Sequence, residues 1–386
     1  MEPLPREPAS PPAPLTAPRP DYLSLERWSA TRDGYFSLGD RLNHNRSQSR
    51  SALPVPVWLP NTTVVRLMAT RLTQPSGEEA LILRILQWLL PRVCATRGSS
   101  RAVVVDSGAN EGAWSLIAAS YGCRSVAIEP QGECVHLIRA AAKASKLESH
   151  VAIVQTMLST IRTTAQVPRG QCHGTAQFLI PGACTRAAWR LPQENRTSAV
   201  DWRHHRCNRA GVSDTTAAGR NLLNSADSRA LGRDNVSSAS LDELLLMPKG
   251  RLPDASPDDR FRRPAGAREC GEMVALWHLD AEGAEIDAAS SALLLLRGGC
   301  IERVVAEAMP ASWGAHGVNV SAAIGALRAL FRGWHCVALC GSRRRFDWTI
   351  ESFNAALAPR RKYPCLNVYC VKPELEAELE AMLQRV

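Results

Sequence analysis

Residues Val103–Gln131 read VVVDSGANEGAWSLIAASYGCRSVAIEPQ, and this stretch decides the fold. Three valines open it, and the turn from Gly108 to Gly112 separates them from an apolar stretch of helical character. A second short apolar run follows. The pattern predicts a buried strand over 103–105, a helix over 112–121 and a second strand over 125–128.

The same alternation continues toward the C-terminus. A helix is expected over Cys134–Leu147 and a third strand over Val151–Val154. Farther along, one helix is expected to carry Ile286, Ala289, Leu293 and Leu296 on a single apolar face. Further strands are expected within 273–285, 301–310, 334–339 and 366–372. Strands that alternate with helices predict an α/β fold: a Rossmann-like, seven-stranded, mostly parallel sheet with helices on both faces and a late hairpin.

The chain divides by composition into three parts. Residues 1–52 are rich in Pro, Ala, Arg and Ser and predict a disordered arm. Residues 53–100 predict a strand and helix extension, with Ser76 as the N-cap of the helix. Residues 101–386 predict the main domain, with a flexible insertion at about 160–235.

Charge and hydropathy restrict the classes of partner. The 386 residues carry a formal net charge of +9, but no compact basic block has interleaved aromatic residues. This favours a solvated basic surface over a nucleic-acid site. The N-terminus lacks the apolar core of a signal peptide. No uninterrupted apolar run reaches the roughly 18 residues of a membrane span. We therefore expect a soluble, cytoplasmic protein.

The twelve cysteines are scattered, and none forms a Cys-x-x-Cys pair, so no metal site is expected from them. Those inside apolar runs are expected to pack as free thiols. Cys172, Cys184 and Cys207 lie in an irregular region and could pair in an oxidising compartment. The adjacent His204 and His205 are interpreted as part of a solvated loop.

A ligand site is predicted where the first strand meets the first helix. Glycines at 108 and 112 permit positive φ and a close approach to the backbone. Glu129 ends the next strand, where an acid can accept both hydroxyls of an adenosine ribose. A dinucleotide site would have Gly-x-Gly-x-x-Gly, whereas this chain has Asn110 in the middle. The charge of Asp106 favours S-adenosylmethionine, which is cationic, over NAD. The alternative is a tight turn that binds nothing.

Residues 103–131 resemble the first two motifs of the FkbM-type methyltransferases. Those motifs are close to Asp-Val-Gly-Ala-Asn-x-Gly and Ala-Phe-Glu-Pro. Downstream, SLDELL (240–245), WHLDAEGAE (277–285) and ERVVAEAMP (302–310) are similar to later motifs of the same family. The resemblance covers roughly 101–160 and 236–310, and more loosely extends to about 372. His278 stands at a lysine position of the family pattern, and the insertion displaces the expected adenine-binding loop.

The resemblance implies a class I methyltransferase that uses S-adenosylmethionine, commonly on a hydroxyl of a carbohydrate or small metabolite. It implies that Asp280 and Glu282 face the transferable methyl group as the catalytic residues, with Glu129 on the ribose. The cofactor-binding residues carried over by position are Asp106, Gly108, Ala109, Asn110, Gly112, Glu129 and Pro130.

Methyl transfer to an alcohol needs the reacting atoms held about 3 Å apart and a base for the proton. Either Asp280 or Glu282 could serve as this base. Alternatively, both could be surface residues that cap the next helix. Glu307 and His278 are further candidates. A second hypothesis is a catalytically silent protein that holds S-adenosylmethionine and binds RNA or an acidic partner through its basic insertion.

Overall fold

The computed structural model describes only part of the chain. The described residues are 35–37, 53–55, 57–60, 72, 78–96, 102–168, 172, 233–246, 270, 273–281, 283–308, 310, 313, 318–339, 345–357 and 366–385. Among the predictions, Ser76, Glu282, the histidines 204 and 205, Cys184 and Cys207 lie outside these residues, as do most of the predicted arm and most of the insertion.

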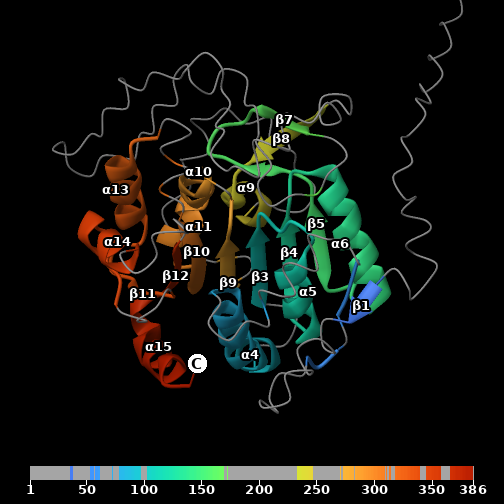
Figure 1. Cartoon of the computed structure of the whole chain (residues 1–386), viewed down its shortest axis with the longest axis horizontal. Helices are drawn as coiled ribbons and strands as arrows, with labels where there is room; N and C mark the ends of the chain where they lie inside the picture. The colour runs from blue at the N-terminus through green and yellow to red at the C-terminus, as the bar shows by residue number, and fades with distance from the viewer. Residues whose placement is uncertain are drawn as a thin grey trace, which may run out of the picture.

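A seven-stranded sheet forms the centre of the molecule (Figure 1), in the order β11-β12-β10-β9-β3-β4-β5. Neighbouring strands pair in parallel from β10 through β9, β3 and β4 to β5. β12 is antiparallel to both β10 and β11, which gives the late hairpin expected from the sequence. The bounds are β3 Ala102–Ser107, β4 Arg124–Ile128, β5 Val151–Val154, β9 Met273–Leu279, β10 Arg303–Ala308, β11 His335–Ala338 and β12 Leu366–Val371.

Helices cover both faces of this sheet. Val104 belongs to the core that includes α4 (Glu78–Thr96), α5 (Ala113–Ser120), α6 (Gly132–Ser145) and α15 (Glu376–Leu383). Val103 and Val105 belong to the opposite core, with α9 (Leu241–Leu246), α10 (Glu285–Ser290), α11 (Leu293–Arg297), α13 (Val320–Leu330) and α14 (Ile350–Leu357). Burial on both faces explains why β3 opens with an unbroken apolar run, residues 102–105, rather than an alternating pattern. The fold is therefore α/β, as predicted.

The predicted helix across 286–296 is wrong in one respect, because two short helices, α10 and α11, replace it. α9 supplies the reason. The carboxylate of Asp242 accepts hydrogen bonds from the backbone N–H groups of Leu294 and Leu295, each at 2.9 Å, and so caps a new helix start. α9 itself begins with the reciprocal capping of Ser240 and Glu243, at 3.0 and 3.1 Å.

The N-terminal residues that the structure describes pack on the main domain. β1 (Tyr35–Ser37) lies within the segment expected to be a disordered arm, and it pairs with β2 (Trp58–Pro60) in antiparallel register. The backbone N–H of Trp58 donates to the hydroxyl of Ser145 on α6 at 2.8 Å. Leu59 and α4 share a core cluster with β3 and α5, so the extension completes one face of the sheet.

A small sheet of order β6-β8-β7 follows β5 in the chain and lies at one end of the large sheet (Figure 1). It consists of β6 (Met157–Leu158), β7 (Thr164–Pro168) and β8 (Arg233–Ala239). β7 and β8 pair in antiparallel register, from Thr164 opposite Ser237 to Pro168 opposite Arg233. β7 and the start of β8 lie inside the approximate limits, 160–235, that were predicted for the insertion.

Disulfides replace the free thiols expected in the apolar runs, and Cys172, for which a pairing with Cys184 or Cys207 was considered, pairs with Cys134 instead. The described residues include four pairs: Cys94–Cys123, Cys134–Cys172, Cys270–Cys300 and Cys336–Cys370. Their partners lie 29 to 38 residues apart in sequence, so local spacing gave no signal of the pairing. Among the helices described here, none is long and apolar enough to cross a membrane.

Candidate functional site

The candidate site lies where the order of the strands changes direction. The chain passes from β3 to β4 and β5 on one side, whereas β9 and β10 lie on the other side of β3. In open α/β sheets, ligands bind beyond the carboxyl ends of the strands at such a switch point. The residues that follow β3, β4 and β9 are therefore brought together, as the sequence predicted.

The loop after β3 has an unusual backbone. Gly108, Asn110 and Gly112 all have positive φ, at 75°, 51° and 82°. A Cβ on Gly108 would lie 1.6 Å from the carbonyl oxygen of Asp280, and one on Gly112 would lie 2.8 Å from the Ile138 side chain. Packing against the end of β9 and against α6 therefore requires both glycines, before any ligand is considered.

The N–H groups of this loop are used within the protein. Those of Gly108 and Ala109 both donate to the carbonyl of Ile128, at 3.0 and 3.1 Å, and that of Gly112 donates to the carbonyl of Ala109 at 2.7 Å. The N–H of Asn110 donates to a carboxylate oxygen of Glu129 at 2.9 Å. An anion-binding cradle needs free N–H groups that point at the ligand. These four are already engaged.

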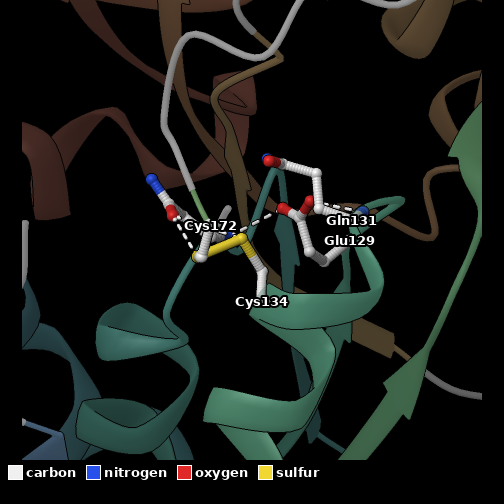
Figure 2. Close-up of a disulfide and its surroundings, with 5 residues drawn as sticks. Glu129, Gln131, Cys134 and Cys172 are labelled. Atoms are coloured by element: carbon white, nitrogen blue, oxygen red, sulfur yellow. Dashed lines mark hydrogen bonds between the residues drawn. A yellow bond between two sulfur atoms is a disulfide. The ribbon is translucent and has the colours of Figure 1, made fainter. Parts of the chain in front are cut away.

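Glu129 connects the end of β4 to the loop. Its Oε2 faces Asn110, and its Oε1 accepts the N–H of Gln131 at 2.8 Å (Figure 2). The side chain is 2% exposed, and burial raises its pKa to about 7 against the opposing effect of these hydrogen bonds. The side chain of Gln131 contributes a further hydrogen bond to this carboxylate. Each carboxylate oxygen can accept two hydrogen bonds, so these three contacts leave acceptor capacity for a ligand hydroxyl. Pro130, which follows, is buried.

Asp106 differs from its expected role, because its carboxylate is fully buried and turned into the protein. Its Oδ2 accepts hydrogen bonds from the backbone N–H and the hydroxyl of Ser115, at 3.0 and 2.7 Å. Its Oδ1 lies 2.9 Å from Nδ1 of His278, which is opposite it in the β3–β9 register. The negative charge thus caps the first turn of α5 and pairs with a histidine. It is not offered to a ligand.

His278 is 5% exposed and lies between Asp106 and the ring of Trp114, whose centroid is 5.5 Å away. Burial lowers its pKa, but the hydrogen bond to Asp106 and the charges of Asp106 and Asp280 more than offset this, so the net pKa is raised. His278 is therefore a buried, acid-paired histidine.

Asp280 follows β9 directly. Its backbone N–H donates to the carbonyl of Ser107 at 3.0 Å, which holds it beside the glycine loop. Its Oδ1 is buried, and no side chain or backbone group of the described residues forms a hydrogen bond with it. A buried carboxylate oxygen without a partner is costly and calls for an explanation. The predicted second catalytic residue, Glu282, lies outside the described residues, so the pairing of the two carboxylates stays a prediction.

Sequence reasoning treated Glu285 only as the start of a helix. It is indeed the first residue of α10, but its carboxylate is 1% exposed. It accepts hydrogen bonds from the N–H of Gly283 and from the indole N–H of Trp313, both at 2.6 Å. Burial raises its pKa to about 7. The partner Trp313 is distant in sequence, which explains why no local pattern revealed this contact. Glu307 lies half-buried in β10, opposite Asn367 of β12.

Comparison of the chain with protein-family models and with curated protein sequences finds no match. Within the described ranges, no group of three His, Cys, Asp or Glu side chains is placed to hold a metal ion.

Proposed function

We propose that the chain is an S-adenosylmethionine-dependent methyltransferase of the FkbM type, which acts on a hydroxyl of a carbohydrate or small metabolite. One observation carries the proposal. A strand-terminal carboxylate, Glu129, is held against a left-handed Gly-x-Asn-x-Gly loop at the switch point of a mostly parallel sheet. The mostly parallel seven-stranded sheet also supports the class I proposal, and the antiparallel β12 forms the late hairpin predicted from the sequence.

The loop favours an adenosine ligand without phosphates. A dinucleotide would place its pyrophosphate on free N–H groups at the start of α5. Here the amides at 108, 109, 110 and 112 already donate within the protein, and Ser115 in the first turn of α5 donates to Asp106. A pyrophosphate would meet few free donors at this loop. A neutral or cationic group would not incur this cost.

The residues fit such a ligand in two roles. Glu129 would accept the ribose hydroxyls, since its oxygens retain acceptor capacity beside the loop. The close packing of Gly108 on Asp280 would bring the methionine end of the ligand beside the end of β9. Bound S-adenosylmethionine would supply an electrophilic methyl group on its sulfonium.

Asp280 is the proposed base, because its Oδ1 is buried beside this loop and has no partner among the described residues. It would take the proton of the acceptor hydroxyl as the acceptor oxygen forms its bond to the methyl carbon and the carbon–sulfur bond breaks. Asp106 and His278 would support the site from behind by fixing α5 and β9 to each other.

Calorimetric titration with S-adenosylhomocysteine and with NAD tests the proposal. We expect wild type to bind S-adenosylhomocysteine, Glu129→Gln to bind it at least tenfold more weakly, or about 1.4 kcal/mol, and neither protein to bind NAD. Glu148→Gln, a change of the same kind at an exposed position, is the matched control. Tight binding of NAD, or no binding of S-adenosylhomocysteine to the folded wild type, would reject the proposal.

A catalytically silent binding protein remains the second candidate, since the buried His278 replaces the lysine of the family pattern. Such a protein would bind S-adenosylhomocysteine but transfer no methyl group to any hydroxyl acceptor. A transfer assay separates the two.

A further inference from the structure

A disulfide lies directly beside the candidate ribose site. Cys134 is fully buried in the first turn of α6, and Cys172 is half-buried four residues past the end of β7. Their Cα atoms are 4.8 Å apart, although the residues are 38 positions apart in sequence. Figure 2 shows the bond close to Glu129 and Gln131, on the side of the loop that follows β3. The bond thus attaches Cys172 to α6 beside the site.

Asn110 connects this disulfide to the carboxylate. Its Oδ1 lies 3.0 Å from Sγ of Cys172 and 3.6 Å from Sγ of Cys134. Its backbone N–H donates to Oε2 of Glu129 at 2.9 Å. One residue therefore contacts the disulfide through its side chain and the candidate ribose-binding group through its main chain.

The backbone of Asn110 is left-handed, with a φ of 51°. Asparagine adopts this region more readily than most residues but less readily than glycine, so contacts of its side chain help to hold it there. The flanking Gly108 and Gly112 are freer to change conformation, because glycine has no Cβ. A covalent bond packed on the Asn110 side chain restricts the one residue of this turn that orients Glu129.

We propose that the Cys134–Cys172 disulfide is a positioning element of the cofactor site, which fixes Asn110 and so increases the affinity for the adenosine part of the ligand. This rests on the proposed function. As two thiols the same cysteines could still contact Asn110, but they would no longer tether Cys172 to α6. The fully assembled site would then belong to an oxidising compartment.

The test compares two double variants. Cys134→Ala/Cys172→Ala, the clamp variant, removes the proposed positioning disulfide. Cys270→Ala/Cys300→Ala, the control variant, removes a disulfide at the opposite, amino-terminal end of β9. There the backbone N–H of Val274 donates to the carbonyl of Cys300. The two bonds close loops of 38 and 30 residues. Removal of either bond should therefore increase the conformational entropy of the unfolded chain by a similar amount.

Two readouts are needed, namely hydrogen exchange of the amides of residues 106–114 without ligand and the dissociation constant of S-adenosylhomocysteine. In the clamp variant we expect exchange at Asn110 to be at least tenfold faster and binding at least tenfold weaker. In the control variant both should stay within twofold of wild type. Unchanged exchange at Asn110 in the clamp variant would overturn the proposal, even if binding weakened.

The outcomes also separate this inference from the proposed function. If wild type binds no S-adenosylhomocysteine, the proposed function fails, and with it the claim about affinity, whatever the exchange shows. If the clamp variant does not fold, Asn110→Gly provides the same test with all disulfides intact, since it keeps the left-handed backbone but removes the contact with sulfur. Wild-type affinity in that variant would overturn the proposal.

Discussion

Substitution of Gly108 by alanine should separate backbone strain from packing at the candidate site. The added Cβ would be built at a φ of 75° and 1.6 Å from the carbonyl oxygen of Asp280. The left-handed conformation costs about 1–2 kcal/mol for a residue with a Cβ. Forcing an extra methyl group into a packed contact costs about 1–3 kcal/mol more. We therefore expect Gly108→Ala to lower the free energy of unfolding by about 2–5 kcal/mol.

Gly122→Ala is the control for this prediction. Gly122 has a φ of 82°, but a Cβ there would meet nothing within 4 Å, so only the conformational cost of about 1–2 kcal/mol applies. Urea unfolding of both variants, monitored by circular dichroism, gives the two values. The larger loss in Gly108→Ala measures the contact between the loop and the end of β9. Equal losses would refute the close packing of Gly108 on Asp280.

Two further predictions concern the supports of the site. The pKa of Glu285 is raised to about 7, so its protonated form contributes stability that is fully present below its unfolded pKa and is lost as the pH rises through 7. Between pH 5 and pH 8, wild type should lose about 2–3 kcal/mol more unfolding free energy than Glu285→Gln, and parallel pH profiles would contradict this. Asp242→Ala removes the cap of α11 and should lower the free energy of unfolding, measured in urea, by about 1 kcal/mol. Asp242→Asn should retain part of the stabilisation that the cap provides. Equal stability of Asp242→Ala and wild type would show that the cap contributes nothing.

The first half of the sheet could be predicted from sequence because its signals are local. The expected strand over 125–128 is observed as Arg124–Ile128, and the one over 151–154 has the same limits. A fully buried strand, a glycine turn and an amphipathic helix each have a sequence signature that spans only about ten residues. The position of Glu129 beside the loop then follows from parallel pairing.

Contacts between residues that are far apart in the sequence were not predicted, because local patterns carry no signal of them. Asp106 was expected to face a ligand, but its partner His278 is 172 positions away and becomes its neighbour only through the β3–β9 register. The disulfide that joins Cys134 to Cys172 depends in the same way on the path of the chain after β7. The contact of Trp313 with Glu285 also joins separate elements. Such pairs are set by tertiary packing, which one sequence does not show.

The most direct test of the account is transfer of a radiolabelled methyl group from S-adenosylmethionine to a panel of carbohydrates and small hydroxylated metabolites, by wild type and by Asp280→Asn. Asp280→Asn keeps the shape of a side chain whose buried Oδ1 has no partner among the described residues, but it cannot accept the proton. We predict that wild type labels at least one hydroxyl acceptor and that Asp280→Asn binds S-adenosylhomocysteine with wild-type affinity but transfers at least a hundredfold more slowly, the lower range for loss of a general base. Wild-type transfer rates in Asp280→Asn would contradict the assigned base, and the absence of transfer to every acceptor, with the ligand bound, would contradict the central claim that this chain is a methyltransferase.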